Sequence, residues 1–273
     1  MPTQAEKADI FRALHEREGA FIIPNPWDVG TARLLAYLGF EALATTSAGY
    51  AFSVGQQDNT IGRDEMMRHV AQIAAATDLP VSGDLTNGFG DDPATVAETV
   101  RLAAAAGLVG CSIEDATLRP EEPIYPHDLA VERVRAAATA ARALPFPFTL
   151  TARAENFLAG RPDLADTIRR LQAYQEAGAD VLYAPLLRGK EEIAAVVGAV
   201  ERPVNVLMGI PGINLSLAEL AAIGVKRVSV GSGLARLALS ATWRAAEAMR
   251  DHGSFAPFDE GLSSRELSAL FKR

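Results

Sequence analysis

Cysteine is almost absent from this chain of 273 residues, because Cys111 is the only one. A single cysteine excludes an internal disulfide, which agrees with a reducing compartment. Long apolar runs are also absent, and the mixed polar start of the sequence is unlike a signal peptide. These absences lead us to expect a cytoplasmic protein with no membrane role.

Positive charge is in deficit, with 26 Lys and Arg against 34 Asp and Glu and a net charge of -8. A negative chain repels nucleic-acid phosphates, so we expect no nucleic-acid partner. Histidine is scarce too: we expect His15, His69 and His252 to face solvent on helices and His127 to lie in a loop. None of the four has the spacing of metal ligands.

Eight short runs rich in β-branched or apolar residues alternate with segments of helical periodicity. They span residues 20–24, 41–47, 80–84, 108–115, 147–153, 180–185, 203–208 and 226–231. Eight such alternations are the count of a closed (β/α)8 TIM barrel. An open doubly wound sheet is the alternative, but it opens with a Gly-rich phosphate turn where this chain has NPWDVG. We therefore predict one (β/α)8 barrel domain over residues 1–273.

The C-terminal segment, residues 253–273, is surplus to eight strand–helix units and is interpreted as a helical extension. Its apolar side chains are those of Phe255, Phe258, Leu267, Leu270 and Phe271. Apolar residues in a tail are typical of a surface that packs on a neighbour. We expect this tail to contact the barrel or a partner subunit.

Acidic residues close two neighbouring strand runs: Asp84 ends PVSGD, and Glu114 and Asp115 end LVGCSIED. The carboxyl ends of parallel strands converge in space, so these acids are expected to share one pocket. Hard divalent ions such as Mg²⁺ prefer oxygen ligands of this kind. The alternative is that each acid caps the helix that follows it.

Arg153 closes the next run, FTLTAR, and could bind a substrate carboxylate through two hydrogen bonds. The alternative is a structural ion pair with Glu114 or Glu155. Alternation along the strands turns Asn205 into the barrel and sends Cys111 toward the helices, where it is expected to be a buried core residue.

Two turns could hold an anion through their backbone N–H groups. Residues 45–49, TTSAG, leave the second strand, and residues 230–233, VGSG, leave the eighth. Either stretch could equally be a turn without a ligand. Asp58, in the loop GQQDNT, has no assigned role on this reasoning alone.

The ordered motifs of the chain resemble the isocitrate lyase and phosphoenolpyruvate mutase superfamily along nearly the whole length. The matching segments are NPWDVGTARLLAYLGFEALATTSAG, GDLTNGFG, SIED and TARAENF. The resemblance implies a (β/α)8 barrel whose last helix is exchanged between subunits of a tetramer. It also implies Mg²⁺, for which Mn²⁺ could substitute, and a small anionic substrate with a 2-oxo or 2-hydroxy carboxylate.

The same resemblance assigns roles to residues. Asp84 would bind the metal directly, while Glu114 and Asp58 would hold metal-bound water. The substrate carboxylate would lie on the turn made by Ser47, Ala48 and Gly49. Arg153 would contact the other end of the substrate, and Asn205 would line the same pocket.

Two departures from the family pattern bear on the reaction. The second acid of the metal motif is replaced by Thr86, which lowers the charge of the metal site. The loop 116–128, ATLRPEEPIYPHD, contains neither the Lys-x-Cys-Gly segment of the lyases nor the Lys-x-Asn of the mutases. The usual acid for protonating the leaving carbanion is therefore missing. Arg119, Tyr125 and His127 are the nearby candidates, each expected to be an ordinary solvated loop residue.

These observations predict a Mg²⁺-dependent carbon–carbon lyase or decarboxylase that acts through a metal-stabilised enolate. The enzymatic alternative is carbon–phosphorus chemistry on a substrate like phosphonopyruvate. The non-catalytic alternative is a barrel that binds a carboxylate and has lost activity. In each case a homo-oligomer is expected.

Overall fold

The strands lie together in one curved parallel sheet. The structure is a computed structural model that describes residues 2–272, and within this range eight strands pair in the order β1-β8-β7-β6-β5-β4-β3-β2. They are β1 (Phe21–Ile22), β2 (Leu43–Ala44), β3 (Val81–Asp84), β4 (Gly110–Glu114), β5 (Thr149–Arg153), β6 (Val181–Tyr183), β7 (Val204–Leu207) and β8 (Arg227–Ser229). Each of them falls inside one of the eight predicted runs.

The sheet curls until its two edge strands meet. The backbone N–H of Ala44, in β2, donates to the carbonyl of Pro24, just after β1, at 3.1 Å. The Asn25 side chain reinforces this seam by donating to the Thr45 carbonyl at 3.1 Å. The chain thus has an α/β fold of eight parallel strands, consistent with the predicted (β/α)8 barrel.

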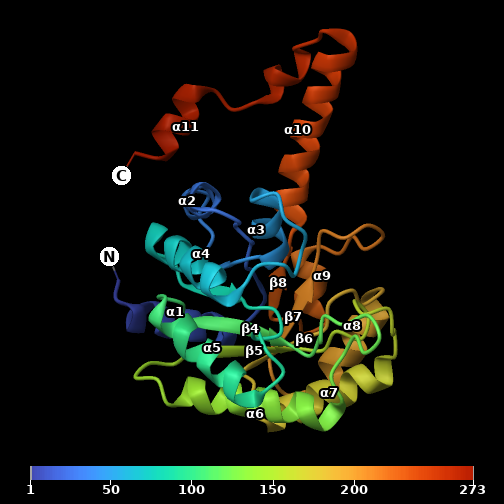
Figure 1. Ribbon diagram of the computed structural model, residues 1–273. Coiled ribbons are helices and arrows are strands. Elements are labelled where there is room, and N and C mark those ends of the chain that lie inside the picture. The colour runs from blue at the N-terminus through green and yellow to red at the C-terminus, as the bar shows by residue number, and fades with distance from the viewer. Residues whose placement is uncertain (1, 273) are drawn as a thin grey trace.

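Helices surround the sheet, as Figure 1 shows. They are α1 (Gln4–Glu16), α2 (Val29–Tyr37), α3 (Ser47–Ser53), α4 (Arg63–Ala76), α5 (Pro93–Ala105), α6 (His127–Arg142), α7 (Leu164–Glu176), α8 (Lys190–Gly198), α9 (Leu217–Ala222), α10 (Gly233–His252) and α11 (Ser264–Leu270). Helix α1 packs against the sheet through Phe11, whose neighbours include Phe21 and Val109. No helix in the described part of the chain has both the length and the apolar character that crossing a membrane requires.

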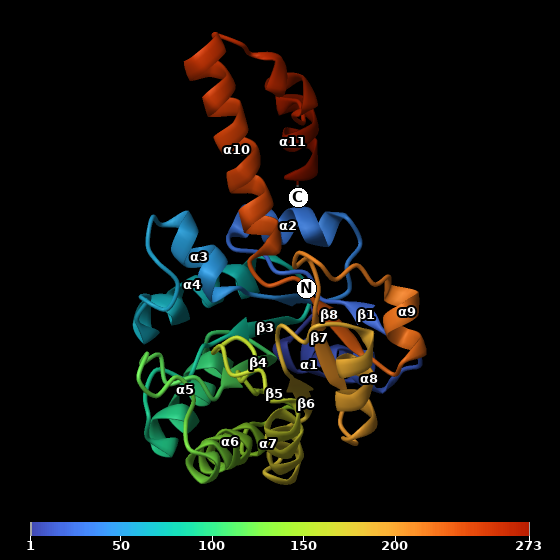
Figure 2. The same ribbon diagram turned by 90° about the vertical axis from the view of Figure 1, so that its right-hand side faces the viewer.

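Helix α10 extends away from the sheet and carries the C-terminal segment with it (Figures 1 and 2). A short 3-10 helix, Ala256–Glu260, follows α10, and α11 turns back toward the barrel, where it contacts α2. Phe255 and Phe258 are 68% and 59% exposed, so this part of the predicted apolar tail is not covered by its own barrel, whereas α11 contacts α2 as expected of a tail that packs on the barrel.

Burial confirms the expectation for the cysteine and corrects that for two histidines. Cys111 is buried, as alternation predicted. His15 was expected to face solvent but is buried between the rings of Phe11 and Phe21, which it meets edge-on. His69 is also buried, and His252 is exposed as expected.

His69 is covered because α3 packs over this face of α4. Its ring stacks on that of Tyr50 with centroids 3.7 Å apart. Burial lowers the pKa of His69 from 6.5 to about 4, and its Nε2 has no hydrogen-bond partner. The imidazole is therefore neutral in the folded protein.

We expect His69→Phe to make the protein less sensitive to acid. Between pH 6.5 and about 4 the unfolded chain binds a proton at His69 that the folded chain does not, so stability falls as pH falls. The full effect is at most about 3 kcal/mol. Urea unfolding of the variant and the wild type from pH 7 to pH 4 measures the difference. Parallel curves would contradict this account of His69.

Candidate active site

One guanidinium joins the acids at the carboxyl ends of neighbouring strands. Arg153, the last residue of β5, directs Nη1 to Asp84 Oδ1 at 3.0 Å and to Glu114 Oε2 at 3.1 Å. Its Nε donates to Glu155 Oε1 at 2.7 Å. The parallel register explains the meeting, because Glu114 and Arg153 are partners across β4 and β5. We call Asp84, Glu114, Arg153 and Glu155 the carboxylate cluster.

The carboxylate cluster carries more negative than positive charge. Burial raises the pKa of Glu114 well above its usual value, with Arg153 opposing the rise. Burial also raises the pKa of Glu155, whose Oε2 is buried without a hydrogen-bond partner. Burial alone would lower the pKa of Arg153, but the surrounding carboxylates raise it well above normal. Within the described part of the chain, three acids therefore share one paired cation, and their side chains are largely shielded from water.

Asp84 also connects the cluster to the turn after β2. Its Oδ2 accepts hydrogen bonds from the Ser47 N–H at 2.9 Å and from the Ser47 hydroxyl at 2.8 Å. The helix that follows β3 is capped by Asp92, so the alternative that Asp84 caps it is wrong. Gly49, in the same turn, donates its N–H to the Thr46 side chain at 3.2 Å. A Cβ on Gly49 would lie 2.5 Å from Thr46 Cγ2, so only glycine fits there.

Asp115 does not join the carboxylate cluster, although it follows Glu114 directly. Alternation turns it toward the helices, where its carboxylate accepts from Arg170 at 2.9 Å and from the Tyr174 hydroxyl at 2.6 Å. Its Oδ1 accepts from the Glu155 N–H at 2.8 Å. Asp115 thus supports the segment that holds Glu155, and the expectation that it shares the pocket is wrong.

Asp58 lies on the exposed loop between α3 and α4. Partial burial by the surrounding protein, together with the charge of Asp84, raises its pKa. Its carboxylate accepts from its neighbour Asn59 at 2.9 Å. Among residues 2–272, no three His, Cys, Asp or Glu side chains are already arranged as a metal site. Asp58 nevertheless lies close enough to both acids for charge to be felt, since Asp84 helps to raise the pKa of Asp58 and Asp58 helps to raise that of Glu114.

Beneath the carboxylate cluster lies a cavity of about 50 Å³ inside the sheet. Asp84 and Arg153 line it from above, and Asn205 lines it as predicted. Two further residues, Tyr183 and Arg227, line the same cavity and were missed. Ser229 lines the cavity too, and Arg227 lies two residues before it on β8. Alternation along a strand places such residues on the same face, so the sequence did contain a signal for Arg227.

The candidate proton donors in the loop 116–128 form their side-chain contacts with residues outside the carboxylate cluster. Arg119 pairs with Asp91 at 2.7 Å, and the Tyr125 hydroxyl donates to the same carboxylate at 2.6 Å. Tyr125 is only 1% exposed, so the expectation of a solvated loop residue is wrong for it. His127 begins α6 instead of lying in the loop, and its ring contacts Asp128.

In the second candidate anion turn, residues 230–233, two backbone N–H groups already have a hydrogen-bond acceptor within the protein. The N–H groups of Val230 and Gly231 both donate to Asn25 Oδ1 at 2.9 Å. These two donors stabilise the seam between β8 and β1. The interpretation of VGSG as a turn without a ligand fits this geometry.

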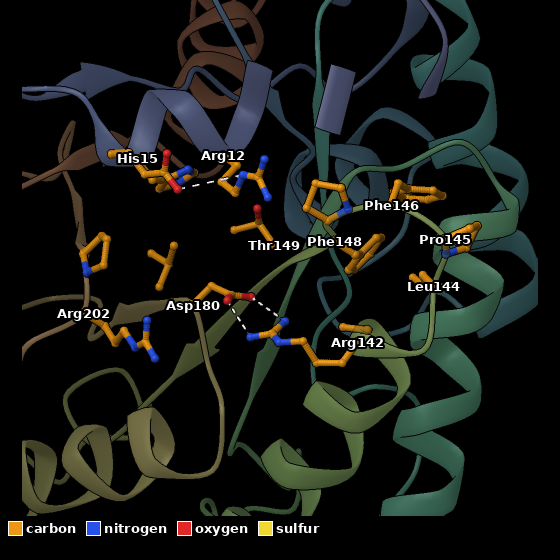
Figure 3. A pocket seen from close by; sticks show the side chains of 15 residues that line it. Arg12, His15, Arg142, Leu144, Pro145, Phe146, Phe148, Thr149, Asp180 and Arg202 are labelled. Carbon is orange, nitrogen blue, oxygen red and sulfur yellow. Dashed lines mark hydrogen bonds and ion pairs between the residues drawn. The ribbon is translucent and has the colours of Figure 1, made fainter. Parts of the chain in front are cut away.

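A second, larger cavity of about 640 Å³ opens beside α1, where β5 and β6 begin (Figure 3). Arg12 and His15 line it from α1, and Phe146 lines it from the segment before β5. Arg142 on this wall is held by Asp180, with its Nη2 2.6 Å from Oδ1. Because none of the predicted site residues lines this cavity, the candidate active site is the carboxylate cluster at the opposite ends of the strands.

Parallel strands in a curled sheet, with a carboxylate cluster at their carboxyl ends, define an enzyme site of the α/β-barrel type. A family model described as phosphoenolpyruvate phosphomutase matches residues 11–250. The chain belongs to this family, within the superfamily that also contains the isocitrate lyases. The predicted family and the prediction of an enzyme are both confirmed.

Two relatives in sequence span most of the chain. An uncharacterized protein of Mycobacterium tuberculosis (strain H37Rv) is 36% identical over 246 residues, which cover 88% of this chain and 89% of that protein. The oxaloacetate decarboxylase of Chromohalobacter salexigens is 29% identical over 259 residues, covering 92% of this chain and 88% of the relative.

Solved structures agree with the fold. A Burkholderia cenocepacia J2315 protein described as a lyase/mutase has a TM-score of 0.97 at 65% identity, covering 99% of this chain and 97% of that one. Oxaloacetate acetylhydrolase with its product oxalate has a TM-score of 0.88 at 26% identity, with 99% and 95% covered. Phosphonopyruvate hydrolase with oxalate and Mg²⁺ has 0.85 at 25%, with 97% and 94% covered.

Proposed function

We propose that the chain is a Mg²⁺-dependent lyase or decarboxylase that cleaves a carbon–carbon bond in a small 2-oxo or 2-hydroxy carboxylic acid. The observation that carries the proposal is the carboxylate cluster, in which, among residues 2–272, Arg153 is the only cation paired with the carboxylates of Asp84, Glu114 and Glu155. Such an excess of buried negative charge favours a further cation. Relatives that act on oxaloacetate support the choice of substrate class.

The residues of the carboxylate cluster fit a hard divalent ion. The donors are carboxylate oxygens, and one buried oxygen, Glu155 Oε2, has no partner. Asp84 and Glu114 would hold the ion, with Asp58 contributing through water, and Mn²⁺ could replace Mg²⁺. Thr86 stands where the family has another acid, and it is buried with a positive φ of 46°. Because Thr86 offers no carboxylate, water would complete the coordination shell of the ion. When bound, the ion would supply Lewis-acid stabilisation of an enolate.

The chain's own residues would bind and orient the substrate. The turn of Ser47, Ala48 and Gly49 would bind the substrate carboxylate, with Ser47 already fixed by Asp84. Arg153 would contact the other end of the substrate through its fork of donors. Asn205 would form part of the floor. Burial of the site strengthens each of these charged contacts relative to water.

The direct test is release of pyruvate from oxaloacetate and from a panel of 2-oxo and 2-hydroxy acids, measured with and without Mg²⁺. We expect turnover of at least one member that disappears with EDTA and returns with Mg²⁺ or Mn²⁺. Phosphonopyruvate followed by phosphorus NMR separates the carbon–phosphorus alternative, which the family model supports. Silence on every compound, with oxalate still bound, would favour an inactive carboxylate-binding barrel.

We also propose that the protein is a homo-oligomer, a dimer or tetramer, in which α10 and the tail lie against a second copy. Leu237 and Trp243 on α10 are each 67% exposed, and Phe255 follows at 68%. Apolar side chains gathered on a projecting segment are typical of an interface. Exchange of the C-terminal helix between subunits fits the way in which α10 leaves the sheet (Figure 2).

Trp243→Glu is expected to shift the protein toward the monomer, because it places a charge in the middle of this surface. Light scattering coupled to size exclusion measures the mass. Leu158→Glu is the matched control, since Leu158 is 54% exposed on the loop between β5 and α7 and belongs neither to α10 nor to the tail. A wild-type monomer, or a Trp243 variant of unchanged mass, would contradict the proposed assembly.

A further inference from the structure

Carbon–carbon cleavage leaves an enolate that must receive a proton, and the proposed function supplies no donor for it. The three loop residues expected near the site are held elsewhere, with Arg119 and Tyr125 both bound to Asp91. A donor has to lie against the cavity that Asp84 and Arg153 share. The inference below rests on the proposed function and concerns this missing donor.

Tyr183 occupies the required position. It is the last residue of β6, where its Cα partners are Arg153 on β5 and Asn205 on β7. Neighbours in register point their side chains to the same face, and all three line the cavity of about 50 Å³. The Arg153 guanidinium carbon lies 5.0 Å from the centre of the Tyr183 ring. The phenol therefore lies beside Arg153, the group proposed to contact the substrate at the end away from the Ser47–Gly49 turn.

A chain of hydrogen bonds with a fixed direction ends beside this phenol. Arg227 Nε donates to Asn205 Oδ1 at 2.9 Å, and Asn205 Nδ2 donates to Ser229 Oγ at 3.0 Å. Because arginine only donates, the Asn205 amide cannot be reversed, and the Ser229 oxygen must accept. Ser229 keeps its own hydroxyl proton to donate, and it lies near enough to the Tyr183 phenol to lower the pKa of that group. Ser229 and Tyr183 line the same cavity, so the chain of bonds holds a polar donor beside the phenol.

Arg227 makes this chain unusual, because it is a buried cation that pairs with neutral groups. It is 5% exposed, and its Nη2 donates to Thr151 Oγ1 at 2.9 Å. Its Nη1 lies 3.4 Å from Nε2 of His15, whose Nδ1 contacts the Phe11 carbonyl at 2.8 Å. No carboxylate within residues 2–272 forms an ion pair with Arg227. Burying a charge on neutral partners costs stability, which favours a functional role for the chain.

We infer that Tyr183 is the proton donor to the enolate, in place of the absent loop acid, and that Arg227, Asn205 and Ser229 position its hydroxyl. In oxaloacetate the C3–C4 bond breaks, CO2 leaves, and the electron pair forms the C2–C3 double bond of the enolate. C3 then takes the phenolic proton as the C2 carbonyl reforms, which gives pyruvate and a tyrosinate. The tyrosinate takes a proton from water and completes the cycle.

The electrostatics of the site agree with this role. Burial raises the pKa of Tyr183 to about 12, with Arg153 opposing the rise, so the phenol carries its proton at neutral pH. Arg153 beside the ring would stabilise the transient tyrosinate. Tyr183 is 8% exposed, so bulk water does not readily replace it as the donor.

The experiment compares Tyr183→Phe with the wild type in Mg²⁺-dependent decarboxylation of oxaloacetate and in binding of oxalate, an enolate mimic. We expect kcat to fall about 100-fold or more, the usual contribution of a general acid, while the oxalate Kd measured by calorimetry stays unchanged. Tyr37→Phe, at a tyrosine 69% exposed on α2, is the control. Ser229→Ala should lower kcat less, because Ser229 is proposed to position the phenol and not to supply the proton.

The outcomes separate this inference from the function on which it rests. Absence of turnover in the wild type overturns the proposed function and the inference with it. If the wild type turns over and Tyr183→Phe is equally active, the role of Tyr183 is overturned while the proposed function stands. Loss of oxalate binding in step with kcat would give Tyr183 a binding role and would also overturn it.

Discussion

Asp84→Asn is expected to lower Mg²⁺-dependent turnover about 1000-fold or more, the largest effect on activity that the structure predicts. The amide keeps the size of the side chain and can still accept from Ser47, so the turn after β2 is preserved. It removes the charge that would bind Mg²⁺, and metal stabilisation of an enolate is worth several kcal/mol. Steady-state kinetics over a range of Mg²⁺ concentrations measures the loss.

Asp78→Asn is the matched control for this variant. Asp78 is exposed and lies on the segment before β3, at the opposite end of the strand that carries Asp84. It should leave kcat unchanged. An Asp84→Asn enzyme that keeps wild-type kcat and Mg²⁺ dependence would contradict the role given to Asp84.

Arg153→Met should cause the largest loss of stability. It leaves Glu114, Glu155 and Asp84 without the one cation they share, and removing one partner of a buried ion pair costs about 3–5 kcal/mol. The loss should shrink as pH falls, because protonation removes the charge on the acids. It should also shrink on addition of Mg²⁺, which would bind the same oxygens.

Denaturant unfolding at pH 7 and pH 5, with and without Mg²⁺, measures these changes in the free energy of unfolding. Arg161→Met, at an exposed arginine, is the control and should be nearly neutral. An Arg153→Met protein as stable as the wild type would mean that the buried acids are compensated by something other than this guanidinium.

The sequence was sufficient to predict an α/β fold of eight parallel strands and the convergence of three polar residues at their carboxyl ends. Strand periodicity placed Asp84, Glu114 and Arg153 at the ends of adjacent strands, and a parallel sheet leaves such residues little freedom to lie apart. The same alternation correctly placed Asn205 inside and Cys111 in the core. Applied to Asp115, it would have sent that residue away from the pocket.

The features that the sequence did not reveal depend on contacts between segments that are far apart along the chain. His69 is buried because α3 covers one face of α4, which helical periodicity within α4 does not reveal. Tyr125 is buried because its loop folds back, with Ala116 and Ile124 forming an isolated antiparallel bridge. The direction of the bonds from Arg227 to Ser229 arises only when β7 and β8 pair in register.

Crystals soaked with Mn²⁺ and oxalate, examined by anomalous scattering, test the central claim most directly. We predict a single strong peak in contact with a carboxylate oxygen of Asp84, with oxalate on the ion and against Arg153. A map without that peak, in which Arg153 still bridges Asp84 and Glu114 at the distances seen here, would contradict the proposal of a metal-dependent enzyme.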